Sequence, residues 1–127
     1  MNKEKILVVE DDPLNMELVT DLLEVAGYTV LQAETAKQGI EVAKSANPVL
    51  ILMDVRLPDF DGLAATGILK KDPLTRHIPV VALTASVMPG DEARSLDAGC
   101  AGYIRKPIDT RAFPATVGAF IDSQRKT

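Results

Sequence analysis

The chain has 127 residues, of which 46% are hydrophobic and 25% charged, and its formal net charge is -4 at pH 7. This length suits one domain with a single substantial core. The acidic balance argues against a surface for nucleic acid or anionic lipid, and no apolar run approaches the ~20 residues of a membrane span. Cys100 is the only cysteine, which excludes an intrachain disulfide, and its apolar neighbours indicate a small buried side chain. We expect a soluble cytoplasmic protein.

The spacing of apolar residues predicts that strands and helices alternate five times along the chain. Strands are expected at residues 6–9, 28–31, 49–53, 79–83 and 101–104. Helices are expected from Pro13 to a stop at Gly27, from Thr35 to about Ala46, over 62–71, over about 89–98, and around the apolar positions 113, 117, 120 and 121.

Two helix starts carry explicit capping signals. Asp12 followed by Pro13 has the form of an N-cap with proline at the first helical position. Thr35 with Gln38 resembles a capping box. Two other helices carry weakening residues: Gly67 lies within the third, and Pro114 near the start of the fifth predicts a shortened or irregular beginning there.

Alternating strands and helices predict an α/β fold with one doubly wound (βα)5 parallel sheet. Five such units fit the flavodoxin-like strand order 2-1-3-4-5, in which the first and third strands are neighbours. The residues that end these two strands, Glu10 with Asp11 and Asp54, are then expected to meet at the carboxyl edge of the sheet.

Polar residues at four strand ends predict a site for phosphoryl chemistry at this edge. The carboxylates form a hard-oxygen donor set without histidine or cysteine, which suits hydrated Mg²⁺. Thr84 and Lys106 follow the fourth and fifth strands and would serve phosphoryl oxygens. Asp54 is the candidate nucleophile. Taken singly, each residue also has an ordinary interpretation: a solvated loop acid, a strand-end hydroxyl or a surface lysine, and for Asp12 a helix cap is preferred.

Four segments carry a resemblance to a known family: VVEDDPLNM, ILMDVRLPDFDG, PVVALTA, and the KP pair in YIRKPID. Over essentially its whole length, the chain resembles the receiver domain of two-component response regulators. The stretches LNMELVTDLLEVAGY, HIPVVALTA and GDEARSLDAGC look like the stand-alone DivK-type cell-cycle regulators.

The resemblance implies a role for each acidic residue. Asp54 would accept phosphate from a histidine kinase or a histidine phosphotransfer protein. Asp11 and Asp54 would bind Mg²⁺ directly, together with the main-chain oxygen of Arg56, and Glu10 would act through water. Mn²⁺ is expected to substitute for Mg²⁺.

The resemblance also implies a switch. Lys106 would contact the phosphoryl oxygens, and the Lys106–Pro107 bond would be cis. Thr84 would move toward the phosphoryl group, and Tyr103 would swing inward to fill the space that Thr84 leaves.

On this interpretation residues 1–127 form a receiver domain without an output domain. The chain is a stoichiometric phosphate acceptor with slow self-dephosphorylation, not a turnover enzyme.

It would signal in a phosphorelay through the face formed by the fourth helix, fifth strand and fifth helix. It could be a stand-alone regulator, a phosphate sink or an excised module, and Met1 opening directly onto the first strand favours the first. We further expect Arg56, jointly with Ser86, to influence phosphate lifetime, and His77 to be a loop residue.

Three other functions remain open at this stage. A phosphatase of the haloacid dehalogenase type also uses an aspartyl nucleophile, Mg²⁺, Thr/Ser and Lys, yet neither acidic segment here shows its DxD pattern. An FMN-binding flavodoxin would place phosphate against three carboxylates. A degenerate receiver that only binds partners would lack part of the acceptor site, whose residues are all present.

Overall fold

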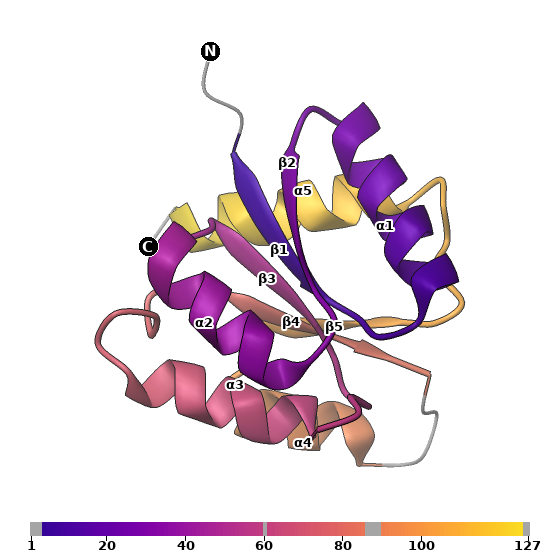
Figure 1. Ribbon diagram of the computed structural model, residues 1–127. Coiled ribbons are helices and arrows are strands. Elements are labelled where there is room, and N and C mark those ends of the chain that lie inside the picture. Colours follow the sequence, from indigo (N-terminus) through magenta and orange to yellow (C-terminus); the bar gives the residue numbers. More distant parts are fainter. Residues whose placement is uncertain (1–3, 60, 86–89, 126–127) are drawn as a thin grey trace.

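The computed structural model describes residues 4–59, 61–85 and 90–125. In these ranges strands and helices alternate from β1 to α5 (Figure 1). The strands are β1 (Lys5–Val9), β2 (Thr29–Ala33), β3 (Leu50–Asp54), β4 (Val80–Thr84) and β5 (Gly102–Arg105). The helices are α1 (Pro13–Val25), α2 (Ala36–Ala46), α3 (Gly62–Lys71), α4 (Asp91–Asp97) and α5 (Phe113–Arg125). The alternation confirms the predicted α/β class.

The sheet is parallel throughout, in the order β2-β1-β3-β4-β5 that the sequence predicts. Its register decides which strand ends meet. Val9 pairs with Met53 across β1 and β3, so the next residues along each chain segment, Glu10 and Asp54, emerge side by side. Thr84 pairs with Arg105 across β4 and β5, which brings Lys106 to the same edge.

Helices cover both faces of the sheet (Figure 1). On one face, α1 and α5 bury their apolar side chains against Ile6 and Val8 of β1. On the other, α2 and α3 pack against Leu7 and Val9 of the same strand. Alternate residues of each strand therefore serve opposite layers. This explains why the inner strands are continuous apolar runs.

Both predicted N-caps form, and the capping box differs only in that the side chain of Gln38 bonds to the residue before the cap. The side chain of Asp12 accepts from the amide of Leu14 at 3.0 Å, and the hydroxyl of Thr35 accepts from the amide of Gln38 at 3.1 Å. The side-chain oxygen of Gln38 in turn accepts from the amide of Glu34, at 2.9 Å. Both helices thus begin where local hydrogen bonding satisfies their first amides.

Most strand bounds shift by one residue from the sequence-based expectation, and three elements need separate comment. β2 extends to Ala33 because its pairing with β1 continues to the end of that strand, a long-range effect that local propensity does not contain. The expected start of the fourth helix at Pro89 lies outside the described residues, and α4 is described from Asp91. The predicted shortening of the fifth helix is wrong: α5 runs for 13 residues from Phe113. Pro114 is its second residue, where the missing amide hydrogen has no helical partner to lose.

Two side chains outside the site lie as predicted. Cys100 is a buried free cysteine packed into the core beneath α2 and α3. His77 lies in the loop before β4, where its Nε2 is 2.8 Å from the side-chain oxygen of Asn47. Within the described ranges, no helix combines the length and apolar character needed to cross a membrane.

Candidate phosphoacceptor and metal site

Three carboxylates converge at the carboxyl edge of the sheet. Glu10 and Asp11 follow β1, and Asp54 is the last residue of β3. Each offers an oxygen atom, and these oxygens all lie within 4.8 Å of one another. Glu10 and Asp54 are nearly inaccessible, at 1% and 6% exposure, whereas Asp11 is exposed. The neighbouring positions of β1 and β3 thus bring together the three acids that the sequence singles out.

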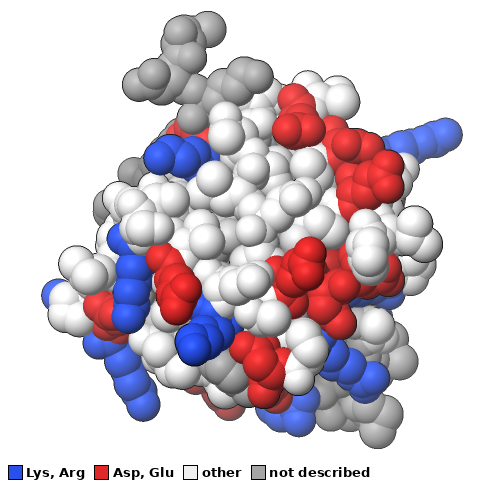
Figure 2. All heavy atoms as spheres, viewed as in Figure 1, with Lys and Arg blue, Asp and Glu red and all other residues white. Residues whose placement is uncertain are grey.

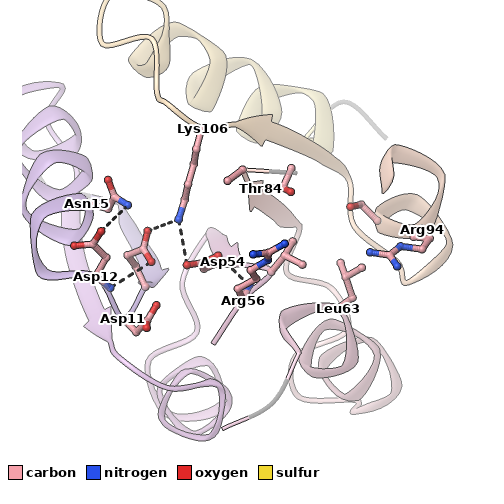
Figure 3. Close-up of a pocket in the computed structure, with 13 residues that line it drawn as sticks. Asp11, Asp12, Asn15, Asp54, Arg56, Leu63, Thr84, Arg94 and Lys106 are labelled. Atoms are coloured by element: carbon pink, nitrogen blue, oxygen red, sulfur yellow. Dashed lines mark hydrogen bonds and ion pairs between the residues drawn. The ribbon is translucent and has the colours of Figure 1, made fainter. Parts of the chain in front are cut away.

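Lys106 joins two of these carboxylates. Its Nζ is 2.7 Å from Oε1 of Glu10 and 3.1 Å from Oδ2 of Asp54 (Figure 3). The main chain of Lys106 is fixed as well, because its amide donates to the carbonyl of Thr84 at 2.8 Å. The Lys106–Pro107 peptide bond is cis. The lysine that sequence places at the fifth strand end therefore reaches across the sheet to the first and third strands.

Burial sets the charge state of this cluster. It raises the pKa of Glu10 from 4.5 to about 7, and the hydrogen bond with Asp54 acts in the same direction, while Lys106 opposes both. Burial by itself would lower the pKa of Lys106, but the hydrogen bond to Glu10 and the charges of Asp54 and Glu10 outweigh it, so that pKa lies above its ordinary 10.5. Lys106 is therefore a permanent cation at neutral pH, and Glu10 keeps its proton to a higher pH than an ordinary glutamate does.

The loop after β3 holds the second oxygen of the candidate nucleophile. The amide of Arg56 donates to Oδ1 of Asp54 at 3.0 Å, so both carboxylate oxygens of Asp54 have a donor. The amide of Gly62 donates to the carbonyl of Val55 at 2.9 Å, which closes the loop where α3 begins. The Asp54 carboxylate is thus held in one orientation by the main chain and by Lys106.

A cavity of about 320 Å³ opens above these groups. The predicted residues Glu10, Asp11, Asp54, Arg56, Thr84 and Lys106 all line it. Its volume accommodates a phosphoryl group with a hydrated ion. Tyr103 does not line it: that side chain is half-buried on β5 and packs against the core beneath α2 and α3. The expected movements of Thr84 and Tyr103 remain predictions, and Ser86 lies outside the described residues.

Sequence reasoning missed three polar residues of the cavity wall: Asn15 and Arg94, both labelled in Figure 3, and Ser95. Asn15 donates to Oδ2 of Asp12 at 3.2 Å, one helical turn along α1. Arg94 projects from α4 toward the cavity. The spacing of Asn15 from Asp12 is a usable sequence signal. For Arg94, only the packing of α4 beside the site reveals the contact.

The surroundings of the site are acidic. Figure 2 shows acidic side chains gathered over α1, at the right of the view. Beside the carboxylate cluster, a second cavity of about 580 Å³ is lined by Glu10, Asp11, Glu17, Asp21 and Glu34, among others. Such a concentration of negative charge favours cations and disfavours an unaccompanied phosphate.

Residues 6–117 match the sequence profile of the response regulator receiver domain. The chain therefore belongs to the response regulator receiver domain family, whose members act in two-component signalling and are not typical turnover enzymes. The match decides against the phosphatase and flavodoxin alternatives.

Within this family, the chain is similar to DivK-type proteins. It is 42% identical over 116 residues to the polar-differentiation response regulator DivK of Brucella ovis, a match that covers 91% of this chain and 94% of the relative. DivK of Brucella abortus (strain 2308) matches to the same extent. The resemblance to DivK-type regulators is thereby confirmed.

Solved receiver domains share the fold. A CheY-like receiver domain protein from Methanospirillum hungatei JF-1 superposes with a TM-score of 0.90 at 29% identity, over 98% of each chain. The receiver domain of the sensor histidine kinase PA1611 from Pseudomonas aeruginosa PAO1 has a TM-score of 0.87 and 32% identity, over 95% of this chain and 99% of that one. That domain holds a magnesium ion coordinated in its active-site cleft.

The donor set of this chain fits such an ion. The carboxylates of Glu10, Asp11 and Asp54 lie close enough together to bind a single ion. Their oxygens are hard donors of the kind that Mg²⁺ prefers. Lys106 neutralises part of their negative charge through its bonds to Glu10 and Asp54. A divalent cation would offset the remaining repulsion among the three acids.

Proposed function

We propose that the chain accepts a phosphoryl group on Asp54 from the phosphohistidine of a histidine kinase or a histidine phosphotransfer protein. The observation that carries the proposal is the fixed, nearly inaccessible Asp54 carboxylate, with one oxygen bonded to the Arg56 amide and the other to Lys106. A carboxylate oxygen would form the new bond to phosphorus while the bond from phosphorus to the histidine nitrogen breaks. The electron pair stays on that nitrogen.

The other residues would stabilise the product. We propose that Lys106 turns from the carboxylates to the phosphoryl oxygens, which offer it stronger charge-assisted hydrogen bonds. The Thr84 hydroxyl, at the rim of the cavity, would donate to another of these oxygens, and Tyr103 would then move inward. Each charge-assisted hydrogen bond contributes about 1.5–3 kcal/mol, enough for a few of them to shift a two-state equilibrium.

Asp11, Asp54 and the main-chain oxygen of Arg56 would hold Mg²⁺ directly, and Glu10 would do so through water. The ion would supply positive charge that offsets the charge of the acids and of the phosphoryl group, and Mn²⁺ is expected to replace it. The magnesium in the similar PA1611 receiver domain supports this assignment. Removal of divalent ions with a chelator should stop phosphotransfer, and added Mg²⁺ should restore it.

We propose further that residues 1–127 work as one receiver domain without an output domain, in the cytoplasm. The DivK relatives support the single-domain organisation, because the match already covers 94% of their length.

The phosphorylated chain would then signal by contact with a protein, through the face of α4, β5 and α5, and lose its phosphate slowly. Arg56, whose side chain lines the cavity, would influence that rate, and unchanged dephosphorylation in Arg56→Ala would contradict its part.

The deciding experiment is phosphotransfer from radiolabelled histidine kinases to the purified chain. Wild type and Asp72→Asn, a matched change at a partly exposed aspartate that follows α3, should take up label, and Asp54→Asn should not. Label on Asp54→Asn would show that the acceptor is another residue. An unlabelled wild type, tested against all kinases of the organism, would favour a degenerate receiver. The Asp54→Glu variant carries a negative charge but lacks the three phosphoryl oxygens. It should therefore bind a downstream partner more weakly than the phosphorylated chain does.

A further inference from the structure

A carboxylate in the loop after the phosphoacceptor is bonded to a different helix. Asp59 accepts from the amide of Ala36 through Oδ1 at 2.9 Å and from the amide of Lys37 through Oδ2 at 3.0 Å. These are the first two residues of α2, whose amides have no partner inside the helix. In Figure 1 the loop that leaves β3 passes beside the start of α2. The negative charge also faces the positive end of the helix dipole.

This contact is unlike the other aspartate caps of the chain. Asp12, Asp61, Asp72 and Asp109 each accept from an amide two or three residues further along their own segment. Asp59 instead lies 23 and 22 residues from its two donors. A local cap fixes one helix end, whereas this one fixes two separate segments to each other.

The helix has a cap of its own. Thr35 accepts from the amide of Gln38, and the side chain of Gln38 accepts from the amide of Glu34. Asp59 therefore adds to a helix start that is already capped. The loop depends more heavily on the contact, since Asp59 lies within it, between Arg56 and the beginning of α3.

The same loop positions the candidate nucleophile. The Arg56 amide bonds to Asp54, and the carbonyl of Arg56 is the proposed metal ligand. The loop is held at its near end by the bond from the Val55 amide to the carbonyl of Leu83, at 3.1 Å. Asp59 holds its far side. Together with the bond from the Gly62 amide to the Val55 carbonyl, these attachments oppose rotation of the Arg56 peptide group.

We propose that Asp59 is a positioning residue for the phosphoacceptor site: by fastening the loop to the start of α2, it holds the Arg56 peptide group beside Asp54. This role rests on the proposed function of Asp54, and it ties the loop that follows Asp54 to α2, another element of the fold. By linkage, cation binding at the Arg56 carbonyl and the contact of Asp59 with α2 strengthen each other.

The test compares Asp59→Ala and Asp59→Asn with Thr35→Ala. Thr35→Ala removes a cap from the same helix without touching the loop, so it controls for a general weakening of α2. The first readout is hydrogen exchange of the Arg56 amide, measured by NMR without metal or phosphate. The second is the Mg²⁺ dissociation constant, measured by titration calorimetry.

In Asp59→Ala the Arg56 amide should exchange about fivefold faster, in keeping with the loss of a cap. Mg²⁺ should bind about tenfold more weakly, the low end of the range for outer-shell partners. Asp59→Asn, which keeps one acceptor oxygen, should fall between Asp59→Ala and wild type. Thr35→Ala should leave both quantities within about twofold of wild type.

Two outcomes would overturn the inference: an Asp59→Ala variant with wild-type Arg56 exchange, or a Thr35→Ala variant that reproduces the full effect of Asp59→Ala. The first readout also separates this inference from the proposed function. If Asp54 is not the acceptor, phosphotransfer fails in the tests above, while faster Arg56 exchange in Asp59→Ala still establishes the positioning contact.

Discussion

Gly62→Ala should damage both stability and the acceptor site, because the first residue of α3 lies against the main chain of Asp54. A Cβ at position 62 would overlap the carbonyl oxygen of Asp54 and lie 2.9 Å from its carbonyl carbon and 3.1 Å from Cγ of Met53. The first two obstacles are backbone atoms at the end of a central, buried strand. They cannot rotate away as the end of a flexible side chain would.

The cost is that of overpacking a rigid site, about 1–3 kcal/mol. Gly67→Ala is the matched control: it lies in the same helix, and its Cβ would meet nothing within 4 Å. There the change should stabilise the fold by about 0.5–1 kcal/mol, because alanine loses less backbone entropy than glycine. The two variants of one helix should thus differ by about 1.5–4 kcal/mol, with opposite signs relative to wild type.

Urea unfolding followed by far-UV circular dichroism measures both differences. Because the displaced group is the main chain of Asp54, phosphotransfer to Gly62→Ala should also slow, while Gly67→Ala should accept label at the wild-type rate. A Gly62→Ala variant as stable as Gly67→Ala would refute the reasoning. It would mean that the end of β3 yields easily, against the burial of every residue in that strand.

Three further predictions concern other parts of the molecule. Gly102→Ala should destabilise the fold by about 1–3 kcal/mol in the same unfolding assay, because its Cβ would overlap the ring of Phe120 on α5. Cys100 should resist alkylation in the folded protein at pH 8 and react at once in urea, since burial raises its thiol pKa and blocks the reagent; fast labelling of the folded chain would contradict this. In the metal-free protein, the Tm of Glu10→Gln should improve relative to wild type as pH rises from about 5 to about 8. Burial raises the pKa of Glu10 to about 7 in the folded protein, so the stability gained from its protonated form is complete below pH 4.5 and is lost as pH rises through 7. Glutamine does not titrate, so the variant does not lose stability in this way. A Tm difference that stays constant with pH would show that Glu10 ionises normally.

Local chemistry explains why the fold could be predicted so fully. The Asp12–Pro13 and Thr35–Gln38 signals are short-range, and the structure realises both with hydrogen bonds inside their own segments. The boundary of β2 could not be predicted in the same way, because Ala33 belongs to the strand only through its pairing with Val9. Pro114 was misinterpreted for a related reason: its cost depends on its position within the helix, and that position is set by where α5 begins.

The residues of the candidate site also fall into two groups: those that the sequence predicts and those that only the packing of the elements reveals. Asp54, Lys106 and Thr84 were recognisable because the carboxyl ends of parallel strands share one edge, so strand order alone brings them together. Arg94 was missed because it enters from a helix whose packing no local pattern records. Asp59 resembled an ordinary acidic loop residue, and its role in the fold is visible only from its two bonds to α2.

The sequence by itself determined the alternation of elements, the helix caps, the strand order and the identity of the acidic cluster. Each of these follows from hydrogen bonding or apolar periodicity within a few residues, combined with general rules for parallel sheets. The tertiary structure decided the rest: the bond of Lys106 to Glu10 across 96 residues, the raised pKa of Glu10, and the close approach of Gly62 to Asp54. These depend on register and on burial, and both arise only when segments distant in the chain pack against one another.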